Sequence, residues 1–515
     1  MTTASDQREI ELKLALLPGQ VPLFERLMAR RHVLPVRQQL LTRYFDTPGF
    51  ALSQQGLALR VRRAGRRWLQ TLKTEGERAG GLSARDEYET PVARDALDWE
   101  RFPPAAQERV PQALRAQLVP VFETRFERKA WTVRGQAGAR IEVALDVGEV
   151  RAGERGLPLC EVELELKSGR PDALFALALP WTGQLDCLPL DASKAERGVR
   201  LAQGQSAAPV KSAPVALSPD MTVQAGMVAI CRACLAQFQA NLPGVLQDDD
   251  IEYVHQARVA LRRLRAALRL YRRVCPLSDA SLQTGLGALV AALGPARDWD
   301  VLCLTTLPAI EPSFNDRPAW QQLMQEMESR RQTVRQAMRA ALREARPAQW
   351  LLAFHRWLAQ PAGRELPDQG SSRLQAQQAW AGQAVQAGHR KIIRRSRDLG
   401  RLTPGQRHAL RILLKRQRYA AEFFQTLYPS GRQLKYLHRL TALQDSLGLA
   451  NDAQVARTLL TDAQGDAPCF ALGFVQGWLT CQVREAAGPA SAKDWKALTK
   501  FRPRWQGRAI APDDG

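Results

Sequence analysis

The stretch Glu9-Ile10-Glu11-Leu12-Lys13, close to the start of the sequence, alternates charged and apolar side chains at every position. In a β-strand, successive side chains point to opposite faces, so the charged residues share one face and the apolar residues share the other. Such a strand ordinarily packs its apolar face on a core and exposes its charges to water. The same arrangement recurs several times with charges of both signs, and this recurrence weakens the explanation of a solvated face.

Further segments of the first 200 residues alternate in the same way. They are residues 39–45, 57–62, 68–74, the segment with Glu87 and Glu89, 141–146 and 161–167. Seven short strands with turn signals between them indicate a mostly antiparallel β domain, in which residues 21–31 form a short helix. If the sheet closes into a barrel, the charged faces point into its lumen, where unpaired charge is costly and requires a partner or a ligand.

The two kinds of charge on these faces suit a phosphate chain and a metal ion. Guanidinium and ammonium groups would surround the phosphates, and the residues concerned are Arg60, Arg62, Lys73 and Arg128. Carboxylate oxygens would hold a hard divalent cation such as Mg²⁺ or Mn²⁺, from Glu9, Glu11, Glu161, Glu163 and Glu165. Enzymes that transfer phosphoryl groups usually combine a metal ion with basic side chains, and both act on the phosphoryl oxygens.

An ordered set of motifs carries a resemblance to a known family. The set comprises Glu9-x-Glu11-x-Lys13, Arg60-x-Arg62, Thr71-x-Lys73, Gly80-Gly81-Leu82 with Glu87, Arg128, Glu142 to Asp146, Glu161-x-Glu163-x-Glu165 and Ser193-Lys194. Residues 6–203 thus resemble the CYTH domain of triphosphate tunnel metalloenzymes. The resemblance implies an eight-stranded antiparallel tunnel that binds a linear triphosphate with a divalent metal and hydrolyses it.

The resemblance also implies roles for individual residues. The implied substrate ligands are Lys13, Arg60, Arg62, Lys73, Arg128 and Lys194. The implied metal ligands are Glu9, Glu11, Glu161 and Glu163, with Glu165 as a further candidate. Glu87, Glu142 and Asp146 either take part directly or brace a neighbouring Arg or Lys, and the sequence leaves both readings open.

Among the members of this family, the layout is most similar to the bacterial inorganic triphosphatase type, which carries a second, helical domain. The expected reaction is metal-dependent hydrolysis of inorganic triphosphate to pyrophosphate and phosphate. An organic substrate such as thiamine triphosphate is an alternative, but it needs an aromatic shelf that the sequence does not assign. A second alternative is a non-catalytic adaptor that binds polyphosphate without turnover.

The positive charge is concentrated in the carboxyl-terminal part. Residues 211–515 contain 42 Lys and Arg against 25 Asp and Glu, a net charge of +17, which leaves +4 of the total +21 for residues 1–210. A segment rich in Ala, Ser, Pro and Gly separates the two parts, and we expect a linker at residues 204–217. The second part is therefore the expected polyanion binder.

Beyond the linker the periodicity becomes helical, and one basic helix is repeated. An apolar stripe from Val254 to Tyr271 has a basic stripe beside it. The stripe's residues are His255, Arg258, Arg262, Arg265 and Arg269, and His408, Arg411, Lys415 and Arg418 repeat the first four at a constant offset of 153. A turn motif, Leu293 to Asp300, is echoed by Leu447 to Asp452. We expect no acidic partners at i,i+4 spacing, which favours polyanion binding over a solvated face.

The repeated His and basic helix, with the turn motif, resembles the CHAD domain, over residues 218–505. The resemblance implies inorganic polyphosphate as a ligand. Nucleic acid fits less well, although it is not excluded, because the stripes contain no interleaved aromatic residues of the kind used by single-strand binders. The sequence therefore predicts an α+β multidomain protein, in which an eight-stranded antiparallel β tunnel precedes an all-α, internally duplicated helical bundle.

The remaining composition suits a cytoplasmic protein. No stretch approaches the roughly 18 uninterrupted apolar residues of a membrane span, and no secretory signal is visible at the start, so we expect no membrane partner. Eight cysteines are scattered along the 515 residues, and Cys231-x-x-Cys234 is the C-x-x-C pair. Without a second pair or a flanking His, we interpret it as one face of a helix.

Overall fold

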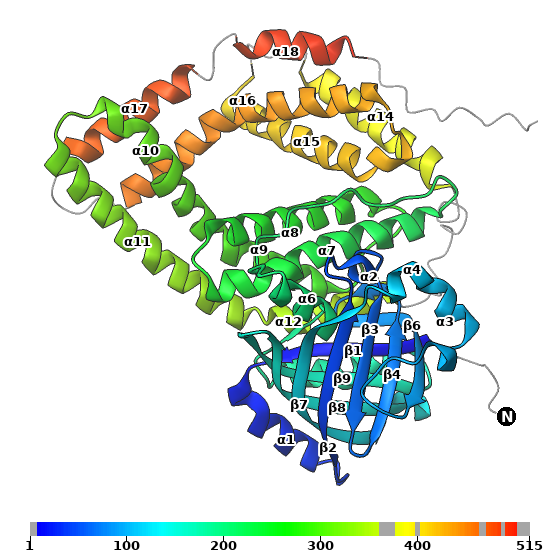
Figure 1. Ribbon diagram of the computed structural model, residues 1–515. Helices are drawn as coiled ribbons and strands as arrows, with labels where there is room; N and C mark the ends of the chain where they lie inside the picture. The colour runs from blue at the N-terminus through cyan, green and yellow to red at the C-terminus, as the bar shows by residue number, and fades with distance from the viewer. Residues whose placement is uncertain (1–7, 360–375, 397–401, 463–469, 486–489, 502–515) are drawn as a thin grey trace, which may run out of the picture. The chain divides into compact units, whose positions relative to one another are not determined.

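A computed structural model describes residues 8–359, 376–396, 402–462, 470–485 and 490–501 (Figure 1). The expected domain ends at residues 6 and 505 lie outside these ranges. The chain divides into two compact units, which we treat separately. The first comprises Met1–Ala208 together with Arg346–Pro361, and the second comprises Pro209–Ala345 and Ala362–Gly515.

The first unit is built on a closed barrel (Figure 1). Within the described residues, eight antiparallel strands follow the order β1-β9-β8-β7-β2-β3-β4-β6, and β6 pairs with β1 to close the ring. The strands are β1 (Arg8–Leu16), β2 (Val36–Asp46), β3 (Ala58–Ala64), β4 (Arg67–Lys73), β6 (Leu82–Val92), β7 (Val119–Arg134), β8 (Arg140–Ala152) and β9 (Arg155–Ser168). Two short strands, β5 (Glu77–Ala79) and β10 (Cys187–Pro189), extend the sheet. The predicted eight-stranded antiparallel tunnel is confirmed.

The register of the strands places opposite charges side by side on one face. Lys13 lies opposite Glu163 across β1 and β9, and Lys73 lies opposite Glu87 across β4 and β6. Directly paired residues on neighbouring strands point to the same face of a sheet, so these charges meet inside the barrel. The alternation in the sequence and the closure of the sheet together produce a polar interior.

The main apolar core of the first unit lies outside the barrel wall. Leu12 and Leu14 of β1 are buried against Phe24 and against Phe175. Phe24 belongs to α1 (Val21–Ala29), which begins and ends close to the expected helix, and Phe175 belongs to α5 (Asp172–Thr182). The short helices α2 (Ala51–Gln54), α3 (Pro104–Arg109) and α4 (Gln112–Arg115) lie between the strands in sequence, and Leu52 of α2 and Ala106 of α3 contribute to a second core cluster.

Part of the inner face is apolar, and a helix packs against it. Phe122 and Phe126 of β7 form a buried cluster with Leu40 and Tyr44 of β2. Residues of α6 (Lys194–Ala202) pack on this cluster, and a Cβ added at Gly198 would lie 2.0 Å from the Phe122 ring. Gly198 therefore permits α6 to approach the ring closely, and the first residue of α6 reaches the polar interior.

The second unit is helical. Its longer helices are α7 (Val223–Gln247), α8 (Ile251–Tyr271), α9 (Ala280–Val301), α11 (Arg317–Glu344), α14 (Gln377–Arg395), α15 (Pro404–Phe423), α16 (Gly431–Asp462), α17 (Phe470–Glu485) and α18 (Ala490–Thr499), with the short α10 (Leu307–Ile310) between α9 and α11. The predicted apolar stripe of α8 is buried at Val254, Leu261 and Tyr271. Cys231 and Cys234 are buried along α7, where burial raises the pKa of Cys234 to about 11. The helix-face interpretation of this pair agrees with that position.

The repeated motif predicted as a turn is helical in both copies, so that prediction was wrong. Residues 293–300 lie within α9, and residues 447–452 lie within α16, where the side chains of Leu447, Leu449, Ala450 and Asn451 are outside the described part. Pro295 cannot donate the usual backbone hydrogen bond to the carbonyl of Ala291. Both residues are exposed, so water can solvate that carbonyl and the helix continues.

None of the helices in the described ranges is both long enough and apolar enough to span a bilayer.

Candidate active site

The barrel encloses a cavity of about 1040 Å³ lined by charged side chains from its inner face. It brings together every predicted substrate ligand, namely Lys13, Arg60, Arg62, Lys73, Arg128 and Lys194. Predicted acidic residues on the same wall are Glu9, Glu11, Glu87, Glu142, Glu163 and Glu165. Asp146 and Glu161 are fully buried beside it. The cavity therefore brings together cations and anions from seven strands and one helix.

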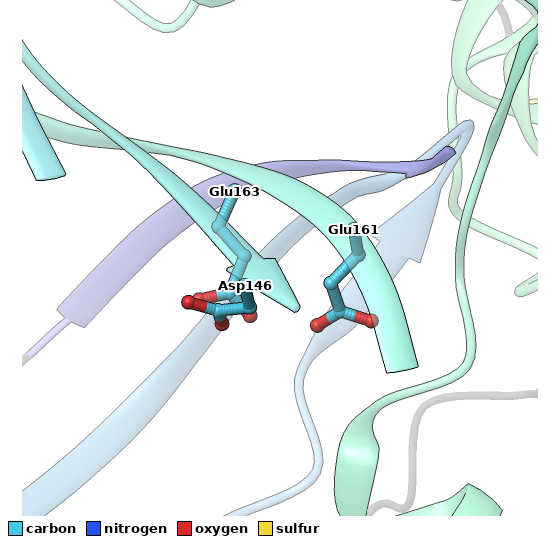
Figure 2. A group of neighbouring side chains, drawn as sticks. All are labelled: Asp146, Glu161 and Glu163. Carbon is cyan, nitrogen blue, oxygen red and sulfur yellow. The ribbon is translucent and has the colours of Figure 1, made fainter. Parts of the chain in front are cut away.

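One group of charges surrounds Lys194. The carboxylates of Asp146, Glu161 and Glu163 project from β8 and β9 toward one another, with oxygens within 4.8 Å (Figure 2). The Lys194 Nζ lies 2.7 Å from Asp146 Oδ2 and 2.9 Å from Glu163 Oε1, and it also donates to Glu161. Burial opposes the charge of Glu163, but Lys194 holds the pKa of this carboxyl well below its usual range. The ammonium thus forms ion pairs with three neighbouring carboxylates at once, and Arg128 and Arg197 supply further positive charge to them.

The local sequence explains why this lysine enters the cavity. Ser193 is the N-cap of α6 and accepts a hydrogen bond from the backbone N–H of Glu196, whose side chain bonds back to the N-cap backbone. This reciprocal capping box fixes where the helix begins, and therefore fixes Lys194 at its first position.

A second group of charges surrounds Arg85. Arg85 Nη2 lies 2.6 Å from Glu11 Oε1, and Arg85 Nε lies 3.2 Å from Glu9 Oε2. Lys13 Nζ lies 2.7 Å from Glu11 Oε1, and Lys73 Nζ lies 2.7 Å from Glu9 Oε2. Burial opposes ionisation of both carboxyls, but the adjacent cations, Lys73 for Glu9 and Lys13 for Glu11, hold their pKa values below the ordinary range. Both glutamates of β1 are therefore ionised and bonded to cations.

Of the three residues with an open role, Glu142 lines the cavity, and Glu87 and Asp146 contact basic groups. Glu87 Oε2 lies 3.0 Å from Lys73 Nζ, and Glu87 Oε1 lies 3.4 Å from Arg60 Nη2. Asp146 accepts two hydrogen bonds from Arg128, at 2.7 and 2.6 Å. Both carboxyl groups thus orient side chains that the sequence analysis predicts as substrate ligands.

Arg62 differs from the other basic residues of the cavity. Among the side chains that the structure describes, no carboxylate lies within 4.0 Å of its guanidinium, and its Nε is buried without a hydrogen-bond partner. Burial, with the neighbouring charges of Arg60 and Arg128, lowers the pKa of Arg62 to about 10. A partly buried cation that is repelled by its neighbours destabilises the empty site, and an anion that enters from solvent relieves this repulsion.

The second unit contains a separate basic pocket of about 440 Å³. Five residues of the two predicted basic stripes line it, namely His255, Arg258, Arg262, Arg411 and Lys415. Arg265, Arg269 and His408 are exposed elsewhere, and Arg418 pairs with Glu422. The expectation that acidic partners are missing at i,i+4 spacing was therefore wrong, because Glu422 follows Arg418 by four residues.

The two copies of the repeat make equivalent ion pairs in this pocket. Arg258 Nη1 lies 3.4 Å from Asp298 Oδ1, and Arg411 Nη2 lies 3.5 Å from Asp452 Oδ1. Each pair joins a basic stripe to the aspartate of the repeated motif. Arg297 donates from Nε to His255 Nδ1 at 3.0 Å, and burial together with Arg297 lowers the pKa of His255. At neutral pH this histidine is an acceptor that orients Arg297.

Comparison with known families agrees with this division of the chain. Residues 7–199 match the CYTH domain model, and residues 229–461 match the CHAD domain model. The chain is a CYTH–CHAD protein. A solved structure, the CHAD domain from the plant Ricinus communis, is 31% identical with a TM-score of 0.50, and the match covers 58% of this chain and 98% of that domain.

A curated relative matches the CYTH part. The inorganic triphosphatase of Haemophilus influenzae is 36% identical over 203 residues, which cover 38% of the CYTH–CHAD chain and 56% of the relative. The chain thus matches about half the length of this relative.

Several lining residues of the CYTH cavity were not predicted as site residues, and Arg85 and Tyr44 are two of them. Arg85 shares a strand face with Glu87, and this two-residue spacing is the signal that identifies it. Tyr44 lies opposite Arg60 in the register of β2 and β3 and stacks on Phe122, with ring centroids 4.4 Å apart. Burial opposes ionisation of Tyr44, but Arg60, Arg62 and Lys194 together lower the pKa of this phenol.

The donor set of the CYTH cavity fits a hard divalent cation. Glu9, Glu11 and Glu163 offer carboxylate oxygens to the cavity, and such oxygens suit Mg²⁺ or Mn²⁺. Glu165 also lines it and bonds to Lys167 at 2.6 Å, where burial raises the pKa of Glu165. Glu161 differs from these four, because it is fully buried beside the cavity and does not line it.

Proposed function

We propose that the CYTH domain hydrolyses inorganic triphosphate to pyrophosphate and phosphate with a divalent metal. The observation that carries the proposal is the Arg62 guanidinium, which has no carboxylate partner among the described residues and lies in a cavity lined by seven further cations. A linear triphosphate supplies anionic oxygens along its whole length, so it can bond several of these cations at once. The similarity to the inorganic triphosphatase of H. influenzae supports the same substrate.

In this proposal the chain binds and orients the substrate, and the carboxylates hold the cation. Arg60, Arg62, Arg128, Lys13, Lys73 and Lys194 neutralise phosphate oxygens, while Glu9, Glu11, Glu163 and Glu165 hold Mg²⁺ or Mn²⁺, with Glu161 as the further predicted ligand. The metal, when bound, polarises the scissile phosphoryl group. A carboxylate of the wall orients the water that attacks in line with the leaving pyrophosphate. Because the cations other than Arg62 are held by ion pairs before substrate enters, little reorganisation is needed.

The lining favours inorganic over organic triphosphates. Among the described residues that line the cavity, Tyr44 is the aromatic one, and one face of its ring is stacked on Phe122 at an interplanar angle of 14°. A thiazole or adenine ring would therefore find little aromatic surface on which to stack. This supports inorganic triphosphate against thiamine triphosphate and ATP.

Phosphate release by the purified full-length chain tests the proposal. We expect rapid release from inorganic triphosphate with Mg²⁺ or Mn²⁺, at least tenfold slower release from thiamine triphosphate, ATP and long polyphosphate, and none after chelation. The tenfold margin corresponds to about 1.4 kcal/mol of transition-state binding. Absence of release from triphosphate with every divalent metal would contradict the enzymatic proposal and favour a polyphosphate-binding adaptor.

We also propose that the CHAD pocket binds inorganic polyphosphate. Burial, together with Arg411 and Arg262, lowers the pKa of Lys415 to about 8. The Lys415 side chain is therefore positively charged below about pH 8. Above that pH it must take up a proton before it can bind an anion. The repulsion among these cations is relieved when a phosphate chain lies between them.

The pKa of Lys415 gives this second proposal a test. Affinity for long polyphosphate should fall by up to tenfold per pH unit above about pH 8, because binding is then linked to uptake of one proton. Lys415→Arg should flatten the dependence, since arginine stays charged throughout. The affinity for polyphosphate is measured for the parent and for Lys415→Arg at fixed ionic strength between pH 7 and 9.5. Identical profiles for the two, or displacement of polyphosphate by equal phosphate concentrations of DNA, would oppose the proposal.

A further inference from the structure

The helix α12 (Pro347–Ala359) belongs to the barrel unit, although it lies in sequence between α11 and α14 of the helical unit (Figure 1). Leu352 is fully buried in the same apolar core as Trp181 and Leu185. α12 packs against α5 and β10. The chain thus returns to the barrel unit at Arg346–Pro361, between the two segments of the helical unit.

An ion pair fixes the orientation of α12 on α5. Arg356 Nε lies 2.8 Å from Asp172 Oδ1, and Arg356 Nη2 lies 3.1 Å from Asp172 Oδ2. A bidentate pair of this kind restrains both position and angle. The helix is therefore held by an apolar contact and by a directional one.

His355 of α12 is buried against the turn between β5 and β6. Gly80 has φ +65°, and a Cβ added to it would lie 2.1 Å from His355 Cδ2. Gly81, with φ +82°, would place a Cβ 2.5 Å from the backbone oxygen of Lys13. Both glycines therefore permit close approach as well as a left-handed backbone. The turn is held between α12 on one side and β1 on the other.

The same turn holds the backbone of a cavity lysine. The Lys13 N–H donates to the Gly81 carbonyl at 2.9 Å, and the Leu190 N–H donates to the Lys13 carbonyl at 2.9 Å. The Gly81 N–H in turn donates to Asp191 Oδ1 at 2.6 Å. Both hydrogen-bonding groups of the Lys13 peptide are thus bound to segments next to α12.

We propose that α12 is a positioning element of the CYTH site, in which His355 supports the Gly80-Gly81 turn and the turn fixes Lys13. The inference rests on the proposed function for its kinetic readout. Displacing a catalytic group by about 1 Å can cost roughly a hundredfold in rate. A helix outside the matched CYTH segment, residues 7–199, therefore contributes to the geometry inside the barrel.

The test is Gly80→Ala in the full chain, with Gly65→Ala as the matched control. Gly65 has φ +62° and nothing within 4 Å of an added Cβ, so both variants carry similar backbone strain and only Gly80→Ala meets His355. We expect about a tenfold to hundredfold loss of triphosphate turnover in Gly80→Ala and less than a twofold loss in Gly65→Ala. Adding His355→Ala to Gly80→Ala removes the clash and should restore at least a third of the lost activity.

Equal turnover of the two glycine variants, or no recovery in the double variant, overturns the inference. Circular dichroism confirms that each variant is folded. If Gly80→Ala is not, His355→Ala alone is compared with the parent, and a twofold to threefold loss of turnover is expected because the turn loses its support. If the parent shows no turnover, the proposed function fails separately. In that case the variants are compared by their affinity for triphosphate, measured by calorimetry. We expect Gly80→Ala to bind more weakly than Gly65→Ala and the double variant to recover part of the affinity.

Discussion

Lys194→Met is expected to lower the free energy of unfolding of the barrel unit by about 3–5 kcal/mol and to abolish triphosphate turnover. Lys194 is 6% exposed and neutralises Asp146, Glu161 and Glu163 together. Methionine fills a similar volume but leaves these three buried carboxylates short of a cation. Urea unfolding followed by tryptophan fluorescence measures the stability, and phosphate release measures the activity.

The pH dependence of this loss distinguishes an electrostatic cause from a packing defect. In the parent, the lowered pKa of Glu163 contributes stability above the ordinary value of 4.5, and that contribution is lost as the pH falls. In Lys194→Met, burial without Lys194 moves the pKa of Glu163 upward, so the deficit is largest near pH 8 and shrinks toward pH 5. A deficit independent of pH would contradict the assignment of Lys194 as the neutralising group.

Two further measurements sharpen this result. Lys194→Arg keeps the charge and should retain most of the stability. Because the three carboxylate groups lie within 4.8 Å of one another, Mg²⁺ should stabilise Lys194→Met more than it stabilises the parent. If Lys194→Arg loses stability and Mg²⁺ does not stabilise Lys194→Met more than the parent, the cluster does not depend on a central cation.

The barrel was predictable because its strands alternate strictly, but β7 was not identified as a strand from the pattern. Its apolar residues change face along the strand. Phe122 and Phe126 point inward under α6, whereas Trp131 and Val133 point outward into the main core. β7 is 16 residues long, but its apolar residues move from one face to the other part-way along it. The sequence therefore lacks the continuous alternation that identifies a strand.

The charged residues were predictable as a set, but their pairing was not. Pairing depends on the register between strands, which places Asp146 opposite Glu161 and opposite Arg128. The alternation of a single strand contains no such information. The location of α12 could not be predicted either, because the apolar face that includes Leu351 and Phe354 suits a helical bundle as well as a barrel wall.

Arg62→Met is expected to lower kcat/KM for triphosphate by about a hundredfold to a thousandfold while leaving the fold as stable as the parent or slightly more stable. Repulsion from Arg60 and Arg128 is relieved when the guanidinium is removed, because it has no carboxylate partner among the described residues. Loss of activity with a gain in stability is the signature of a group maintained for its ligand. Chemical unfolding and steady-state kinetics on one preparation give both values.

Arg63→Met is the matched control, since Arg63 is the next residue of β3 and points to the opposite, exposed face, where it lies over Trp68. Both variants lose one positive charge at nearly the same place, so they change the long-range attraction of triphosphate equally. Arg63→Met should retain activity within twofold and lose at most about 1 kcal/mol of stability from the exposed cation–π contact. Similar kinetic losses in the two variants would mean that Arg62 acts through net charge, and the direct phosphate contact proposed for it would be wrong.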